Sequence, residues 1–308
     1  MRRLAGLVVG IVLITAGLAG CAFSDPRISG TPPSPSTDAV IAAQFTAAAN
    51  DVGTARLAVV TAAGANAGAG KWADMAATLG SSYQVLTGPD PINRIASTST
   101  ATPGSLATSP STTAGSANTS LTTLRDDALA NAKAATGRTA AFWASLAASA
   151  EQVRLGLTGP YGTPAPVDPS ATIETQDEST AVAALLTQYD GAIFGLRAAL
   201  AFLGSADDQS TFESILASLQ SDRATLANLT GPTPAPSPSQ GIFELPAGRD
   251  RAAAMQILTE AQRGLAQASA VWVASAANPA TAIGYLMSNA TLAMDYGLGT
   301  AVWPGWPD

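Results

Sequence analysis

Gly68-Ala69-Gly70-Lys71 contains the residue types of a phosphate-binding loop, in which backbone N–H groups and a lysine hold a phosphate. That loop also needs a glycine at position 65 and a serine or threonine after the lysine, where this chain has Ala65 and Trp72. We therefore predict that the stretch begins a helix instead.

Histidine is absent from all 308 residues, which excludes several kinds of active site. A Ser-His-Asp triad, a zinc-protease helix and any histidine-ligated metal each need at least one imidazole. The chain also lacks the GxSxG and SxxK patterns that mark activated serines. We therefore expect no catalytic residue and a protein that is not an enzyme.

The only cysteine, Cys21, follows an apolar segment in a sequence that predicts covalent modification. Met1-Arg2-Arg3 form a basic head and residues 4–18 are almost wholly apolar, which is typical of a secretory signal peptide. The segment ends in Leu18-Ala19-Gly20-Cys21, which is similar to a bacterial lipobox, where the cysteine sulfur receives a diacylglyceryl group. We therefore predict a signal peptide over residues 1–20, cleavage between Gly20 and Cys21, and lipidation of Cys21.

Lipidation would place the protein on the extracytoplasmic face of the cell membrane. Two acyl chains, at about 0.8 kcal/mol per buried methylene, give practically permanent anchoring. Residues 21–36, with several prolines and serines, would then be a flexible spacer. An ordinary cleaved signal peptide with an incidental cysteine and an uncleaved anchor remain alternatives.

The charge balance limits the partners. Removal of residues 1–20 takes away Arg2 and Arg3 but no acid, and leaves 13 basic and 22 acidic residues, a net charge of −9. This charge argues against nucleic acid and anionic lipid headgroups as partners. The abundance of alanine and the lack of alternating β-branched runs favour an all-α protein.

Apolar spacing divides the chain into two helical parts. In the first, residues 37–157, we expect helices over 37–62 and 71–86, and a third from Ser120 to about 157 that bends near Gly137. Residues 88–119 are rich in Ser, Thr, Gly and Pro, which predicts a disordered low-complexity loop. Residues 158–178 form a linker.

The second part, residues 179–308, carries four helical patterns. They cover about 179–203, 210–229, 249–276 and, after Asn278-Pro279, a stretch that ends near Tyr296. Four apolar seams of this length can close a single core, which predicts a four-helix bundle.

The second part also contains a set of short patterns. They are Leu185-Leu186, Tyr189-Asp190, Arg223, Leu226, Ile242-Phe243-Glu244-Leu245-Pro246, Glu260 and Ala301-Val302-Trp303-Pro304-Gly305-Trp306-Pro307. With them, residues 174–308 resemble a ferritin-like domain of unknown function found in actinobacterial proteins. The resemblance implies a ferritin-like four-helix bundle. Such bundles commonly hold two irons through carboxylates and Glu-x-x-His motifs, and this chain has no histidine to complete those motifs.

Three acids of the second part, Asp190, Asp222 and Glu260, could supply oxygen ligands to a hard cation. Asp190 and Glu260, however, fall on the flanks of their apolar seams, where a carboxylate is usually solvated. Asp222 lies on a seam, and a buried carboxylate is costly without a partner. We therefore predict a buried polar cluster in which Asp222 pairs with Arg197 or with the hydroxyl of Tyr189.

The aromatic ending, Trp303-Pro304-Gly305-Trp306, favours a tail that folds back over the open end of its bundle, with a ligand or partner site as the alternative. Together the features predict a lipid-anchored helical protein with a non-enzymatic binding or scaffolding role at the cell envelope and no cofactor. Its partners would be the membrane, through the diacylglyceryl group on Cys21, and an envelope protein or apolar small molecule. A metal-binding ferritin-like protein or oxidoreductase with a carboxylate-only site, and a carrier of an apolar small molecule, are the alternatives.

Overall fold

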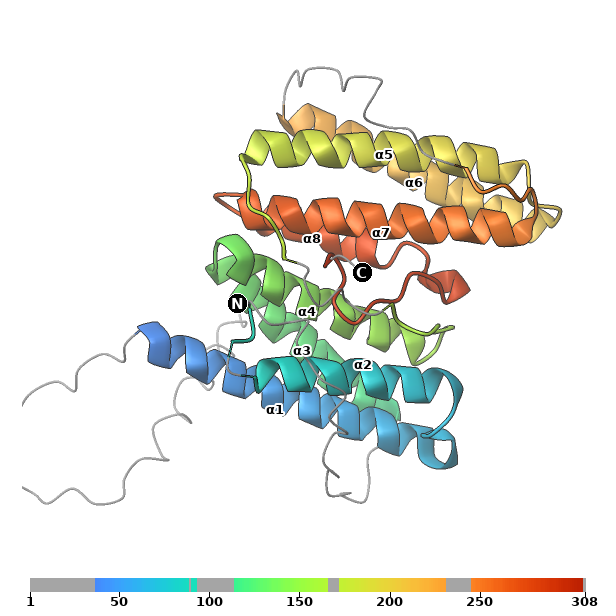
Figure 1. Cartoon of the computed structure of the whole chain (residues 1–308). Coiled ribbons are helices and arrows are strands. Elements are labelled where there is room, and N and C mark those ends of the chain that lie inside the picture. Colours follow the sequence, from blue (N-terminus) through green and yellow to red (C-terminus); the bar gives the residue numbers. More distant parts are fainter. Residues whose placement is uncertain (1–36, 89, 93–113, 166–171, 231–244, 307–308) are drawn as a thin grey trace, which may run out of the picture. The chain divides into compact units, whose positions relative to one another are not determined.

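Eight α-helices account for most of the residues that the structure describes (Figure 1). The structure is a computed structural model and describes residues 37–88, 90–92, 114–165, 172–230 and 245–306. The helices are α1 (Thr37–Ala63), α2 (Gly70–Leu86), α3 (Ala114–Ala134), α4 (Gly137–Gly156), α5 (Glu178–Leu200), α6 (Ala206–Thr230), α7 (Arg251–Ser275) and α8 (Ala280–Ala290). No strand occurs in these ranges. An isolated β-bridge joins Ala165 to Ala301. The predicted all-α class is confirmed.

Helices α1 and α2 form an antiparallel pair close to the predicted ranges. Val52 and Met75, which lie on the apolar seams of the two helices, are fully buried. Nε of Arg56 donates a hydrogen bond across the pair to the carbonyl oxygen of Ala76 at 3.2 Å. Because α2 begins at Gly70, the stretch predicted to start a helix does so.

Helices α3 and α4 form a second antiparallel pair where we expected one bent helix. Gly137, with φ +63°, occupies the left-handed region that favours glycine and begins α4 after two non-helical residues. Nη1 of Arg125 in α3 reaches Oε2 of Glu151 in α4 at 3.1 Å. Helix α3 also begins at Ala114, inside the predicted loop and before the expected Ser120. The extra turn is stable because Ala117, a small residue with little apolar signal, is fully buried.

The contacts of α5 to α8 define their directions. Helices α5 and α6 are antiparallel and joined by an ion pair between Asp190 and Arg223, with Oδ1 and Nε 2.8 Å apart. Helix α7 runs in the same direction as α6 (Figure 1). Their first turns are joined by an ion pair between Asp208 and Arg251, with Oδ2 and Nε 2.7 Å apart. Helix α8 then returns along α7 (Figure 1).

The last helix is shorter than predicted. Helix α8 ends at Ala290, and a 3-10 helix, η3 (Met294–Tyr296), follows where we expected α-helix. The carbonyl oxygen of Ala290 accepts hydrogen bonds from the side chains of Gln152 and Gln262. In a longer helix this carbonyl oxygen would accept a backbone hydrogen bond from the next turn. Here two glutamine side chains satisfy it instead.

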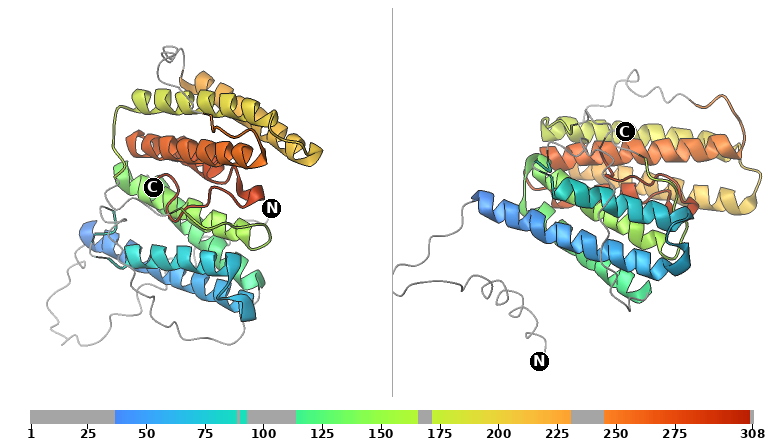
Figure 2. Two further views of the ribbon diagram at one scale, coloured as in Figure 1. Left: turned by 45° about the vertical axis from the view of Figure 1, so that its right-hand side comes forward. Right: turned by 60° about the horizontal axis from the view of Figure 1, so that its bottom comes forward.

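Residues 297–306, here called the C-terminal segment, lie between α4 and α7 (Figure 2). Trp303 and Trp306 are buried, and the ring of Trp303 lies 4.9 Å from that of Phe142 in α4. On the other side, a Cβ atom built on Gly305 would lie 2.6 Å from Cβ of Ala270 in α7. The tail does fold back, but it fills the space between α4 and α7 instead of covering the open end of α5–α8.

From Ile41 onward the described residues form one compact unit with a continuous apolar cluster. Helices α1 and α2 lie against α3 and α4, which are followed by α7 and α8 with the C-terminal segment and then by α5 and α6 (Figure 1). In the part of the chain that the structure describes, no helix has both the length and the apolar character needed to cross a bilayer.

Several sequence predictions concern residues outside the described ranges. They are the signal peptide and Cys21, the spacer 21–36, most of the loop 88–119, and Ile242-Phe243-Glu244. These remain predictions.

Candidate functional site

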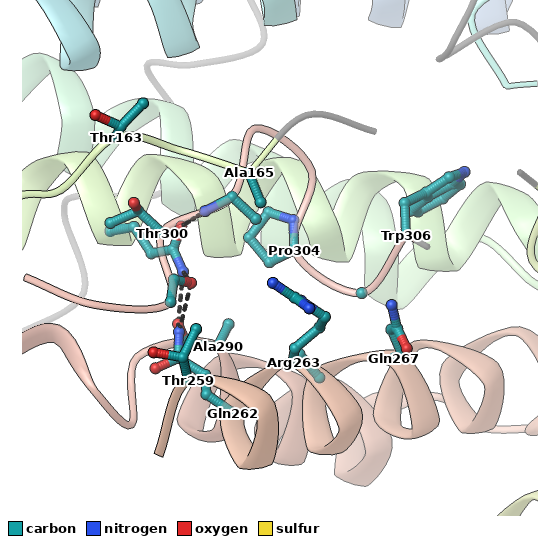
Figure 3. A pocket seen from close by; sticks show the side chains of 15 residues that line it. Thr163, Ala165, Thr259, Gln262, Arg263, Gln267, Ala290, Thr300, Pro304 and Trp306 are labelled. Carbon is teal, nitrogen blue, oxygen red and sulfur yellow. Dashed lines mark hydrogen bonds between the residues drawn. The ribbon is translucent and has the colours of Figure 1, made fainter. Parts of the chain in front are cut away.

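A pocket of about 150 Å³ opens between α7 and the C-terminal segment (Figure 3). Helix α7 forms one wall and the C-terminal segment forms the opposite wall. The lining residues are Gln152, Thr163, Ala165, Thr259, Gln262, Arg263, Ala266, Gln267, Ala290, Gly299, Thr300, Ala301, Pro304, Gly305 and Trp306. The pocket therefore joins side chains from α4 and α7 to a segment more than thirty residues further along the chain.

Two buried glutamines hold the backbone at this pocket. Nε2 of Gln262 donates to the carbonyl oxygens of Ala290 and Gly299, each at 2.7 Å. Nε2 of Gln152 donates to the same two oxygens at 2.6 and 3.3 Å. An amide nitrogen carries two protons, so both donors of each glutamine are used.

The oxygens of the two amides are engaged as well. Oε1 of Gln262 accepts from the N–H of Ala293 at 2.5 Å, and Oε1 of Gln152 accepts from the N–H of Ala301 at 3.1 Å. Because their hydrogen-bonding groups are directed at the backbone, these glutamines position the pocket wall. A ligand would have to be bound by other side chains.

Two glycines allow the C-terminal segment to approach α7 closely. Gly299 has φ +67° and Gly305 has φ +91°, both in the region that disfavours other residues. A Cβ on Gly299 would lie 2.5 Å from Cδ of Gln262. The wall thus depends on glycine for its backbone conformation and for space.

Residues 162–165 support the segment from the side of α4. The N–H of Ala165 donates to the carbonyl oxygen of Thr300 at 2.9 Å. Oγ1 of Thr300 donates to the carbonyl oxygen of Gly162 at 3.0 Å. The pocket wall is therefore fixed on both sides before any ligand binds.

Of the described residues that line the pocket, Arg263 is the only charged one. Its guanidinium extends from α7 toward Pro304, with Gln267 further along the same helix (Figure 3). The hydroxyl of Thr259 donates to the carbonyl oxygen of Met255 at 2.9 Å, which leaves its lone pairs as acceptors. Guanidinium, amide and hydroxyl groups suit binding and orientation of a ligand, and none of them is a ready general base.

The predicted cluster of Tyr189, Arg197 and Asp222 is not assembled. The hydroxyl of Tyr189 donates to Oδ1 of Asn289 at 3.1 Å, and Nδ2 of Asn289 donates to Oγ of Ser269 at 2.9 Å. Burial raises the pKa of the Tyr189 hydroxyl, although its bond to Asn289 acts in the opposite direction. Arg197 is exposed on α5. A buried polar cluster thus exists at Tyr189, but its other members are neutral: Asn289 of α8, which bonds Tyr189, and Ser269 of α7, which bonds Asn289.

Asp222 is half-buried at the side of α6. Burial raises the pKa of its carboxyl group. Among the described residues no side chain bonds this carboxylate, while the hydroxyl of Tyr285 donates to the backbone oxygen of Asp222 at 3.2 Å. The seam suggested deeper burial than the fold provides, because α6 lies on the outside and packs chiefly against α5 (Figure 1).

The three acids considered as metal ligands are also not brought together. Asp190 is half-exposed and pairs with Arg223, and Glu260 accepts from Nε2 of Gln256 at 2.8 Å. Within the described ranges, no group of three or more His, Cys, Asp or Glu residues is placed to hold a metal ion. Asp190 instead ties α5 to α6, and Glu260 makes a local contact on α7.

Comparisons of the chain with protein-family models, curated proteins and solved structures found no match. The interpretation of the pocket therefore depends on its own geometry.

Most of the pocket escapes prediction from the sequence. Of its lining residues, only the aromatic ending with Trp306 stands out in the sequence. Glutamines are mostly exposed in proteins, and Gln152 and Gln262 give no general signal. Gln262 nevertheless falls between Leu258 and Leu265 on the buried face of α7. An amide on an apolar seam predicts buried hydrogen-bond partners, and this pattern could have identified it.

Proposed function

We propose that this protein is a lipid-anchored, non-enzymatic binding protein on the extracytoplasmic face of the cell membrane. The observation that carries the proposal is Leu18-Ala19-Gly20-Cys21 at the end of an apolar segment with a basic head. The proline- and serine-containing residues 21–36 would separate the anchor from α1, which begins at Thr37. The lack of histidine in the sequence supports a role in binding over catalysis.

We also propose that α5–α8 form a ferritin-like bundle. Helices α6 and α7 are consecutive in the chain and run in the same direction, an order that needs a long crossover connection. Ferritin-like bundles contain one such long crossover connection, which supports the assignment, as does the sequence resemblance over 174–308. The pairing of Asp190 with Arg223 favours a structural use of that acid over metal ligation.

The pocket beside α7 supports a binding role. Its walls are held by hydrogen bonds within the protein, so little ordering is needed when a ligand enters. Gln267, Thr259 and Arg263 contribute polar groups to the lining. This composition favours a small polar or charged ligand over the apolar molecule considered as an alternative.

The anchor can be tested in a bacterial host by metabolic labelling with an alkyne fatty acid, followed by membrane fractionation. We expect the parent chain to be labelled and to sediment with membranes. Cys21→Ser should lose the label and leave the membrane fraction after signal processing or accumulate as the uncleaved precursor. Ser24→Ala, three residues away, is the matched control and should behave as the parent. Equal labelling of Cys21→Ser, or no label on the parent, would contradict the proposal.

A further inference from the structure

We propose that at least one water molecule is bound inside the protein, between α4 and the C-terminal segment, by the hydroxyl groups of Ser145 and Ser149 and the indole N–H of Trp303. The three side chains are almost completely buried. Each carries a polar atom, Oγ or Nε1, that makes no hydrogen bond to a described residue. The proposal goes beyond the binding role proposed above and does not depend on lipidation of Cys21.

The two serines lack the partner that other buried serines of this protein use. The hydroxyls of Ser82 in α2 and Ser269 in α7 donate to the carbonyl oxygen four residues earlier in the helix, at 3.1 and 2.7 Å. Such bonds to the preceding turn satisfy a hydroxyl without any further group. Ser145 and Ser149 make no bond of this kind to the described chain. Their hydroxyl groups are therefore available to a ligand.

The position of the serines on α4 places them against the C-terminal segment. Phe142 lies three positions before the first serine and Gln152 three positions after the second, and the serines are four apart. This is the spacing of a single helix face. The ring of Phe142 lies 4.9 Å from that of Trp303, and Oε1 of Gln152 accepts a backbone N–H of the segment. Both serines thus lie between two contacts with the segment that carries the indole.

The three groups together suit water. An indole N–H only donates, whereas a serine hydroxyl both donates and accepts. One water molecule can accept from Trp303 and form further hydrogen bonds with Ser145 and Ser149. Buried waters typically make about three hydrogen bonds, to groups that have no other partner. None of the three residues lines the pocket of about 150 Å³ beside α7. A buried polar site outside that pocket favours the smallest ligand with both donors and acceptors.

The composition of α4 supports a polar role for these two positions. Ala144, Ala147 and Ala148 are fully buried in the same helix. Alanine at 145 or 149 would pack without a hydroxyl, and a buried hydroxyl without a hydrogen bond is unfavourable. A bound water restores the hydrogen bond at a small cost in entropy. Water therefore explains how the core of this alanine-rich helix accommodates two serines.

The first test is a crystal structure of the full chain, solubilised in dodecyl maltoside, at a resolution that shows ordered water. We expect density for a water within about 3.2 Å of Nε1 of Trp303 and of Oγ of Ser145 or Ser149. A well-defined site without water would overturn the proposal. Protein atoms bonded to all three groups would overturn it as well.

The second test counts internal water in solution by oxygen-17 magnetic relaxation dispersion, which does not respond to exchange of hydroxyl protons. We expect the double variant Ser145→Ala/Ser149→Ala to hold at least one long-lived water fewer than the parent. Ser82→Ala removes a buried hydroxyl that is already bonded within the protein, so it is the matched control and should keep the parent's number.

Circular dichroism will verify that both variants fold. An equal number of long-lived waters in the parent and the folded double variant would refute the role of the serines. If the double variant does not fold, Ser149→Ala takes its place in the same measurement, and the crystal structure of the parent still decides whether water is bound.

Discussion

Gln152 of α4 and Gln262 of α7 donate hydrogen bonds to the same two carbonyl oxygens, those of Ala290 and Gly299. Both side chains are almost completely buried. Their shared acceptors lie at the end of α8 and in the C-terminal segment. Two polar side chains within an apolar core therefore connect α4, α7 and the backbone between α8 and the chain's aromatic ending.

Substitution of Gln262 tests how much this connection stabilises the fold. Gln262→Ala leaves the N–H of Ala293 without its acceptor and opens a cavity in the core. We expect the free energy of unfolding to fall by about 2–4 kcal/mol. The measurement is urea denaturation followed by circular dichroism. Gln267→Ala, in the same helix and without a hydrogen bond to another described residue, should change stability by less than about 0.5 kcal/mol. Equal losses would show that the buried bonds contribute little.

Gly299 provides a second test. In Gly299→Ala the new Cβ would contact Gln262 at 2.5 Å, in a residue whose φ is +67°. We expect a loss of about 1–3 kcal/mol in unfolding free energy from strain and displacement of the amide. The matched control is Gly284→Ala, inside α8 with open space around its Cβ position. That change should be stabilising by about 0.5–1 kcal/mol. A stable Gly299→Ala in thermal unfolding would mean that the segment can move away from α7 without cost.

Lys71, which belongs to α2, caps the C-terminus of the neighbouring helix α4. Its ammonium donates to the carbonyl oxygens of Gly156 at 2.9 Å and Gly159 at 2.8 Å. A cation at a helix C-terminus interacts favourably with the helix dipole and with the free carbonyl groups. We expect Lys71→Met to lower unfolding free energy by about 1–3 kcal/mol. Lys133→Met, at the exposed end of α3, should have a small effect in the same denaturation experiment. If Lys71→Met has the same unfolding free energy as the parent, water satisfies the C-terminal carbonyl groups of α4 as well as the ammonium does.

Glu151 predicts a pH-dependent contribution to stability. Burial alone would raise its pKa, but hydrogen bonds from Arg154 at 2.6 Å and Arg125 at 3.1 Å outweigh burial and lower the pKa below the ordinary value for a glutamate. A lowered pKa means that the folded state favours the carboxylate, so the stabilisation is present above the unfolded pKa. It is lost as the pH falls through the folded pKa.

We therefore expect Glu151→Gln to cost about 1–2 kcal/mol at neutral pH. The deficit relative to the parent should shrink below about pH 4.3, the ordinary value for an unfolded glutamate. Urea denaturation at a series of pH values measures it, with Glu260→Gln as control. A deficit that persists unchanged at pH 3 would contradict the ion-pair explanation.

The helices were predictable where large apolar residues repeat and less so where alanine is buried. Val52, Val59 and Met75 form clear seams, and α1 and α2 lie close to their expected ranges. The first turn of α3 is stabilised by Ala117, whose small side chain gives almost no periodic signal. Gly137 appeared as a possible bend, but its positive φ reverses the chain. The sign of φ at a glycine is determined by tertiary packing. The periodicity of apolar residues carries no information about it.

The site was less predictable than the helices for a related reason. Its walls come from Gln152, from Gln262 and from a segment far along the chain, and nothing local in the sequence places these together. The cluster predicted for Tyr189, Arg197 and Asp222 does not form, because the hydroxyl of Tyr189 donates to Asn289, which in turn donates to Ser269. Which polar side chains meet depends on how the helices are packed in three dimensions. Because α6 lies on the outside, Asp222 is only half-buried.

The bond between Gln152 and the N–H of Ala301 joins residues 149 positions apart. Helical proteins usually fold fast because most of their contacts are local in sequence. Closing this loop instead requires a long stretch of chain to be confined at once, with an entropic cost that increases with loop length. We therefore expect Trp303 to dock beside Phe142 only after α5 to α8 are arranged. This all-helical chain would then fold with a late, non-local closing step of the kind that slows the folding of β-sheet proteins.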